Sequence, residues 1–316
     1  MSQSSTLKAV MLSLLAFGIF STHDVIIRYL GGHYSPVQTL FFTSLMSFPL
    51  VTLMLVRDPT AGNLRPIHPW WLAARSLSMA TGGLCAFYAF SVLPIAQAYA
   101  IFFTIPLLVT LLAIPVLGEK VGFHRAAAVI MGLVGVVIVV QPGQATLELG
   151  HLAAFGAAFS SALQSVIARK IGREERRVVM MLYPLAVTFV IMGAGMGFVY
   201  EPMPLTDLAA MGLVAIMGFG AALCLVGAYA IGEAAIVAPM QYSQIIWATF
   251  YGAVIFNESP GKSTLLGAGI IIGSGIYIVI RESMSGTSSN TPVLRTRSRS
   301  YAPGGFRISQ VMRRKS

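Results

Sequence analysis

The sequence predicts an all-α membrane protein of ten transmembrane helices, arranged as two inverted five-helix repeats with both termini in the cytoplasm. Three observations lead to this fold class: the composition, the spacing of the apolar segments and an internal repeat. The chain is 56% hydrophobic and only 10% charged, with a mean hydropathy of +0.78. Soluble domains carry roughly 25% charged residues, so this chain cannot cover itself with a water-facing surface.

Ten apolar segments are long enough to cross a bilayer core, which takes about 20 helical residues. The predicted spans cover residues 8–30, 36–56, 70–91, 95–117, 122–141, 149–169, 178–200, 207–231, 235–256 and 263–281. Basic residues set the orientation, because cytoplasmic loops are enriched in lysine and arginine. With the N-terminus inside, only Arg28 and Lys262 fall outside and Arg75 lies just within the third span, while the other lysines and arginines are cytoplasmic.

The two halves of the chain match each other when shifted by 139 residues, which places Cys85 on Cys224 and Thr110 on Thr249. Each repeat holds five spans, so the second copy inserts upside down relative to the first. Inverted repeats with a midplane binding site are typical of secondary transporters. We divide the chain into an N-terminal segment at 1–7, a first repeat at 8–141, a second repeat at 149–282 and a disordered basic cytoplasmic tail at 284–316.

A longer motif runs from the third predicted helix to the end of the fifth. It begins at Ala86 to Ala100 as AFYAFSVLPIAQAYA and continues through Pro106 to the Leu-Gly-Glu-Lys run at 117–120. It closes with Gly132 to Gly135 and the Gln-Pro-Gly run at 141–143. This pattern resembles the drug/metabolite transporter superfamily, and within it the ten-helix EamA-type proteins. The resemblance covers residues 8–282. It implies a transporter, in a family of exporters of amino acids and toxic metabolites and of importers, including some for riboflavin and S-adenosylmethionine.

The first predicted helix carries a cluster of ionisable residues, His23, Asp24 and Arg28. Asp24 and Arg28 resemble a D-x-x-x-K/R pair in one bacterial branch of the family, whose second-helix arginine is missing here. Ionisable groups inside a bilayer are costly, which makes them functional candidates. One interpretation is a site for a coupling proton or a substrate charge. The other is a local ion pair that neutralises Asp24 while Arg28 reaches towards the surface.

Polar and aromatic residues gather in the third, fourth and ninth predicted helices. The predicted substrate-binding residues are Tyr88, Gln97, Tyr99, Gln241, Tyr242, Gln244 and Trp247. Amides beside aromatic rings suit a pocket that stacks on a planar or amphipathic solute and fixes its polar atoms. The alternative is hydrogen bonding between helices, which contributes only about 0.6 kcal/mol on average in membrane proteins. Tyr88 is also consistent with a core position.

We therefore expect a multi-pass transporter of the cell inner membrane that moves a small polar or amphipathic metabolite by alternating access. Efflux of an amino acid or another metabolite is the main prediction, and uptake of a vitamin or cofactor such as riboflavin or S-adenosylmethionine is the alternative. A membrane-embedded enzyme is disfavoured, because the 11 acidic residues are scattered.

We expect a small molecule as the principal partner. No cofactor or metal site is expected, since the five histidines lack ligand spacing. The basic tail is expected to contact anionic lipid rather than nucleic acid, and a homo-oligomer is left open.

Overall fold

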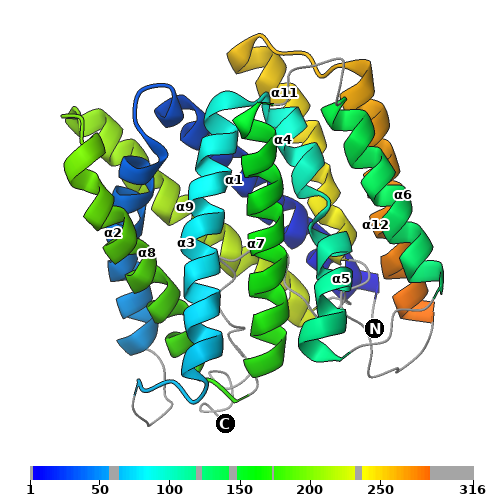
Figure 1. Cartoon of the computed structure of the whole chain (residues 1–316), viewed down its shortest axis with the longest axis horizontal. Helices are drawn as coiled ribbons and strands as arrows, with labels where there is room; N and C mark the ends of the chain where they lie inside the picture. Colours follow the sequence, from blue (N-terminus) through cyan, green and yellow to red (C-terminus); the bar gives the residue numbers. More distant parts are fainter. Residues whose placement is uncertain are drawn as a thin grey trace.

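The computed structural model describes residues 3–56, 64–118, 123–141, 148–172, 174–231 and 237–284. Within these ranges the chain is helical and contains no strand (Figure 1). This agrees with the predicted all-α class. The predicted tail, beyond residue 284, lies outside the described residues, and so do residue 122 of the fifth predicted span and residues 235–236 of the ninth.

The helices follow one another with short connections. In the first half they are α1 (Gln3–Gly31), α2 (Pro36–Val56), α3 (Pro69–Val92), α4 (Ile95–Phe102), α5 (Ile105–Leu117) and α6 (Phe123–Val140). In the second half they are α7 (Leu149–Ile171), α8 (Arg177–Val199), α9 (Leu205–Ile231), the 3₁₀ helix η1 (Ala238–Ser243), α11 (Gln244–Phe256) and α12 (Lys262–Met284).

Six stretches of the described chain are long and apolar enough to cross a membrane. They are Leu7–Gly31, Pro36–Val56, Ile95–Leu117, Leu149–Ile171, Val178–Val199 and Leu205–Tyr229. Shorter apolar stretches lie at Ala126–Val140 in α6 and at Lys262–Ile278 in α12. Helices with these lengths and compositions identify a multi-pass membrane protein.

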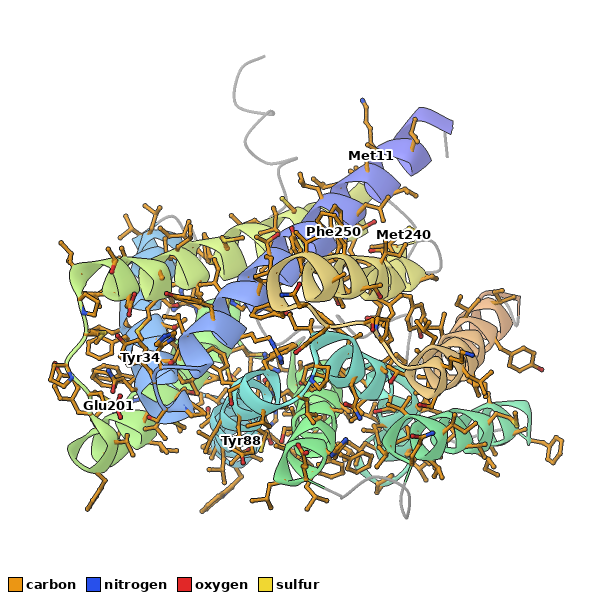
Figure 2. All side chains as sticks on the ribbon, turned by 90° about the horizontal axis from the view of Figure 1, so that it is seen from above. Met11, Tyr34, Tyr88, Glu201, Met240 and Phe250 are labelled. Atoms are coloured by element: carbon orange, nitrogen blue, oxygen red, sulfur yellow. The ribbon has the colours of Figure 1, made fainter. Side chains whose placement is uncertain are left out.

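The main helix pairs are related by exchange of the two halves. Helix α1 packs against α9 and α7 packs against α3, while α3 packs against α8 and α9 against α2. Other extensive contacts join α6 to α12 and α2 to α8, and a smaller one joins α4 to α11. The symmetry is incomplete, because α5 packs more extensively on α7 than its counterpart α11 does on α1. Figure 1 shows α6 and α12 side by side at one edge and α2 and α8 at the other, and Figure 2 shows α1 lying across α9.

A break divides one predicted span in each half. Helix α4 ends at Phe102 and α5 begins at Ile105, while η1 gives way to α11 at Gln244. The bounds of α11, 244–256, are those of α5, 105–117, shifted by 139 residues. Phe103 and Tyr242, also 139 residues apart, pack edge to face with their ring centroids 5.2 Å apart. Equivalent residues of the two halves therefore meet at the centre of the molecule.

The two broken spans also end alike. Gly118 follows α5 with φ of 70°, and Asn257 follows α11 with φ of 52°. Left-handed backbone after a helix is favoured by glycine and, less strongly, by asparagine.

Helices α6 and α12 pack closely against each other, since a Cβ atom on Gly267 would lie 2.5 Å from the carbonyl oxygen of Gly135. Only glycine permits such a contact between backbones.

Polar contacts tie the loop after α1 and the start of α2 to the start of α9. Tyr34 donates a hydrogen bond to Asp207 Oδ2 at 2.5 Å, and this bond raises the pKa of Tyr34 to about 12. The Tyr34 hydroxyl therefore keeps its proton at neutral pH. Gln38 exchanges two hydrogen bonds of 2.8 Å with the backbone of Glu201. Tyr34 and Glu201 lie close together at the left side of Figure 2.

Candidate functional site

A pocket lies between the two halves, near the middle of the helices. It encloses about 1250 Å³ of empty space, including the part that opens to the outside. Helices α1, α2, α3, α4, α7, α8 and α9, the start of α5, η1 and the first residue of α11 all contribute to its lining. A cavity of this size at the junction of two helical repeats suits a small solute.

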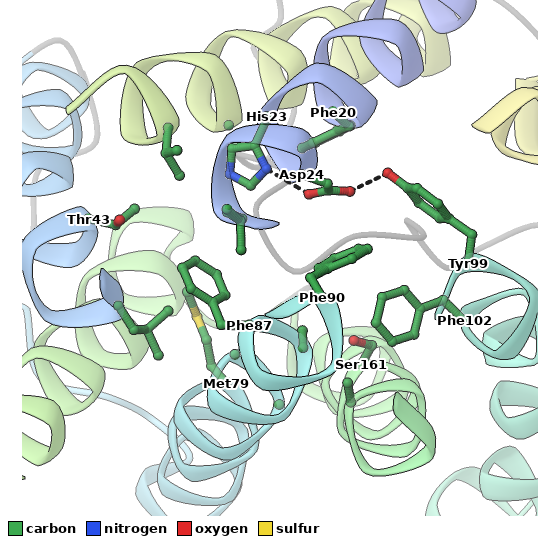
Figure 3. A pocket seen from close by; sticks show the side chains of 18 of the residues that line it. Phe20, His23, Asp24, Thr43, Met79, Phe87, Phe90, Tyr99, Phe102 and Ser161 are labelled. Atoms are coloured by element: carbon green, nitrogen blue, oxygen red, sulfur yellow. Dashed lines mark hydrogen bonds and ion pairs between the residues drawn. The ribbon is translucent and has the colours of Figure 1, made fainter. Parts of the chain in front are cut away.

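Aromatic rings form much of the wall. Phe90 packs against Tyr99 and Phe102 with centroid distances of 5.6 and 5.2 Å, and Tyr99 stacks on Phe103 at 6.2 Å. Figure 3 shows the rings of Phe87, Phe90 and Phe102 around one hollow. The break between α4 and α5 places Phe102 and Phe103 here, because it changes the direction of the chain beside the pocket.

A chain of hydrogen bonds surrounds Asp24, which is only 2% exposed. The Tyr99 hydroxyl donates to Asp24 Oδ2, and Gln244 Nε2 donates to that hydroxyl at 3.2 Å. His23 Nδ1 lies 2.7 Å from Asp24 Oδ1. Both carboxylate oxygens are therefore held in place, as the dashed lines of Figure 3 show. Gln244, from the second half of the chain, is thus linked through the Tyr99 hydroxyl to Asp24 of the first half.

Two further polar atoms of the lining have no hydrogen-bond partner within the protein. They are Gln164 Oε1 and Thr43 Oγ1, and both are buried. The orientation of the Gln164 amide is fixed because its Nε2 donates to the carbonyl oxygen of Ser78 at 3.1 Å, and a carbonyl can only accept. An acceptor and a hydroxyl thus remain available to a bound solute.

Arg28 lies one turn beyond Asp24 and makes different contacts. Its guanidinium donates to Glu258 Oε1 and to the carbonyl oxygens of Phe90 and Leu93, and it lies 4.8 Å from the centroid of the Phe256 ring. In the described part of the chain, Arg28 thus pairs with Glu258 after α11, whereas the local pair with Asp24 is not formed.

The pocket includes five of the predicted site residues: His23, Asp24, Tyr99, Gln241 and Gln244. They come from α1, α4, η1 and α11, and the bonds of Asp24 and Gln244 to Tyr99 join three of these elements.

The other predicted substrate-binding residues lie elsewhere. Gln97 bonds His151 at 2.8 Å and lines a smaller cleft beside Glu258. Tyr242 packs on Phe103, and Tyr88 lies at the outer edge of the bundle in Figure 2.

Trp247 is 37% exposed and stacks on Tyr251, outside the pocket lining. In a regular helix a spacing of three residues would place Trp247 on the same face as Gln244. The start of α11 instead turns Gln244 inward.

Gln164 and the phenylalanines of the wall were missed by sequence reasoning. A polar amide inside an apolar span is a detectable signal for Gln164, which is 2% exposed. The phenylalanines carry no such signal, because their spacing fits any apolar helix. In the described chain no three His, Cys, Asp or Glu side chains come together in a way that could hold a metal ion.

The fold and the pocket define a multi-pass membrane protein with a solute-sized site between two similar halves. The chain belongs to the EamA-like transporter family, whose sequence model matches residues 7–141 and 148–281. It is accordingly a transporter protein of the drug/metabolite transporter superfamily, located in the inner membrane. The resemblance noted in the sequence is confirmed.

Several characterised relatives are named for small-molecule transport. The chain is 29% identical over 269 residues to the S-adenosylmethionine uptake transporter of Rickettsia bellii (strain RML369-C), covering 85% of this chain and 92% of the relative. It is 27% identical over 278 residues to the protein of the same name from Rickettsia prowazekii (strain Madrid E), covering 88% and 94%. It is 27% identical over 259 residues to the riboflavin transporter of Brucella anthropi, covering 78% and 88%.

A solved structure, described only as "Crystal structure of protein", has a TM-score of 0.57 to this chain. The match covers 91% of this chain and 100% of the other at 19% identity, so the likeness concerns the fold alone.

Proposed function

We propose that this protein is a secondary transporter that takes up a small metabolite carrying a planar ring, and that the pocket around Asp24 binds it. The observation that carries the proposal is the pocket itself, where aromatic rings surround a buried carboxylate between the two halves. Uptake replaces the efflux expected from the sequence, because the Rickettsia relatives are named uptake transporters. S-adenosylmethionine and riboflavin, the solutes named for the relatives, are the first candidates.

We also propose the topology that alternating access requires: ten spans in two inverted repeats at 8–141 and 149–282, with both termini cytoplasmic. The exchange-symmetric packing of α1 with α9 and of α3 with α7 supports it, as do the matching bounds of α5 and α11. A C-terminal fusion tests the orientation: green fluorescent protein should fluoresce there, and alkaline phosphatase should stay inactive. The reverse pattern would contradict a cytoplasmic C-terminus.

Within this mechanism, His23, Asp24, Tyr99, Gln241 and Gln244 contact the solute. The ion pair of Arg28 with Glu258 joins α1 to the chain that follows α11, and we propose that it acts as a gate on the outer side of the pocket. Breaking this pair would let the two halves rock apart on that side.

Two partners other than the solute are also proposed. The tail past residue 284 is proposed to contact anionic lipid, and self-association of the chain is proposed as a secondary interaction.

Counterflow in proteoliposomes tests transport directly. Vesicles containing the purified protein and loaded with unlabelled S-adenosylmethionine should transiently accumulate labelled S-adenosylmethionine from outside, and protein-free vesicles should not. The same assay with riboflavin tests the second candidate. If neither solute accumulates while the protein remains folded, the proposed function is wrong for both.

A further inference from the structure

The charged side chains around the pocket have an uneven distribution. Asp24 is the one acid among the described residues of the lining, and no lysine or arginine stands among them. Two arginines lie nearby but outside the lining: the partly buried Arg28 is held by Glu258, and the buried Arg75 donates to the backbone carbonyl of Gln164. A neutral His23 can donate its Nδ1 proton to Asp24 and leave the carboxylate charge in place. Among the described side chains of the lining, Asp24 therefore supplies the negative charge, with no lysine or arginine of the lining beside it.

The lining also offers a hydrogen-bond acceptor to a solute. Gln164 Oε1 is an acceptor, is buried, and has no partner within the protein. With Asp24 it offers oxygen atoms to a solute that carries N–H groups or positive charge. A buried acceptor without a partner is costly, so a solute that donates to Gln164 gains from the contact.

Aromatic rings line the pocket on the sides around Asp24. Phe20, Phe87, Phe90 and Phe102 lie around Asp24 in Figure 3. The faces of aromatic rings attract cations, most strongly where water is excluded, and the same faces stack on a planar ring. An anionic or strongly hydrated solute would gain nothing from this wall.

Resting on the proposed function, we infer that the pocket selects an organic cation carrying a planar ring, with Asp24 as its counter-charge. This inference separates the two solutes named for the relatives. S-adenosylmethionine carries a positive sulfonium and an ammonium group beside a purine, whereas riboflavin is uncharged. The chemistry of the lining favours the former.

The test compares two compounds that differ at a single centre. S-adenosylmethionine and S-adenosylhomocysteine share the purine, ribose and amino acid, and differ by one methyl group and the positive charge on sulfur. Their binding to the purified protein in lipid nanodiscs is measured by calorimetry. Wild type should bind the sulfonium at least tenfold more tightly than the thioether. In Asp24→Asn this preference should fall below threefold, chiefly through weaker binding of the sulfonium.

A matched control removes an acid outside the pocket. Glu174 contacts His68 and its side chain is 63% exposed, so Glu174→Gln should keep the tenfold preference. Equal affinity of wild type for both compounds, or a preference that survives Asp24→Asn, would overturn the cation inference and leave the proposed function standing. Failure of both compounds and of riboflavin to bind would overturn the proposed function as well. The wild-type comparison needs no variant, so it decides the inference even where Asp24→Asn does not fold.

Discussion

Helices α1 and α7 hold equivalent places in the two halves, yet they bring different chemistry to the pocket. Helix α1 packs on α9 as α7 packs on α3. From α1 come His23 and Asp24, and from α7 come Ser161 and Gln164. The packing is shared between the halves, whereas the polar side chains are not. The two halves thus share a similar scaffold, and their unlike side chains make the two walls of the pocket chemically different.

The largest effect is expected at Asp24. It precedes Val25-Ile26 as Ser165 precedes Val166-Ile167 in the second half, so the two positions form a matched pair. Asp24→Asn should lower the initial rate of S-adenosylmethionine uptake by about 10- to 100-fold, since bonds to a charged group contribute about 1.5–3 kcal/mol. Ser165→Ala should change it less than about twofold. A similar loss of uptake rate in both variants would contradict the proposed functional difference between α1 and α7.

The next effect concerns the pair proposed as a gate on the outer side. Arg28→Gln and Glu258→Gln should each lower the uptake rate by about tenfold, because each leaves a charge without its partner. The double variant should be no slower than either single variant, since interacting residues are not additive. Rates in proteoliposomes for the four proteins of this cycle give the coupling. Additive losses would show that the two residues act independently.

A smaller effect is expected on the α7 wall. Gln164→Leu removes an acceptor and should raise the KM for S-adenosylmethionine by about 3- to 10-fold, equivalent to about 0.5–1.5 kcal/mol for a neutral hydrogen bond. Gln97→Leu removes an amide that bonds His151 outside the pocket, and its KM should stay within about twofold of wild type. Equal KM values for the two variants would contradict a binding role for Gln164.

The smallest effects are expected at the aromatic residues that the sequence suggested but the pocket does not include. Trp247→Phe and Tyr88→Phe should change the affinity for S-adenosylmethionine by less than about twofold, because neither residue lines the pocket. Calorimetry in nanodiscs measures both. A fivefold loss at Trp247 would mean that the ninth predicted span binds the solute through its exposed face.

Much of the fold was accessible from the sequence because it depends on local patterns. Apolar length located the helices, and the 139-residue shift anticipated that α5 and α11 would correspond. Within the candidate site, depth in an apolar span pointed to Asp24, and the amides beside aromatic residues pointed to Gln244. Both line the pocket. These signals need only the composition of one helix.

The remaining parts of the site depend on contacts between distant segments. Arg28 meets Glu258, 230 positions away, whereas sequence spacing can propose only partners three or four residues apart. Trp247 is 37% exposed, and the 3₁₀ helix that precedes α11 is a feature that apolar periodicity does not reveal. The aromatic wall is likewise formed by rings from α1, α3, α4 and the break that follows α4.

The most direct test of the account asks whether the solute occupies this pocket. Ser161 lines it in the view of Figure 3. Ser161→Cys, in a background with Cys85→Ala and Cys224→Ala, supplies a single thiol whose rate of alkylation can be followed in proteoliposomes. Thr206→Cys, at an exposed position near the start of α9, is the control. Saturating S-adenosylmethionine should slow alkylation in the pocket at least fivefold and leave the control unchanged. Unchanged labelling of the pocket in a protein that still transports would contradict the account.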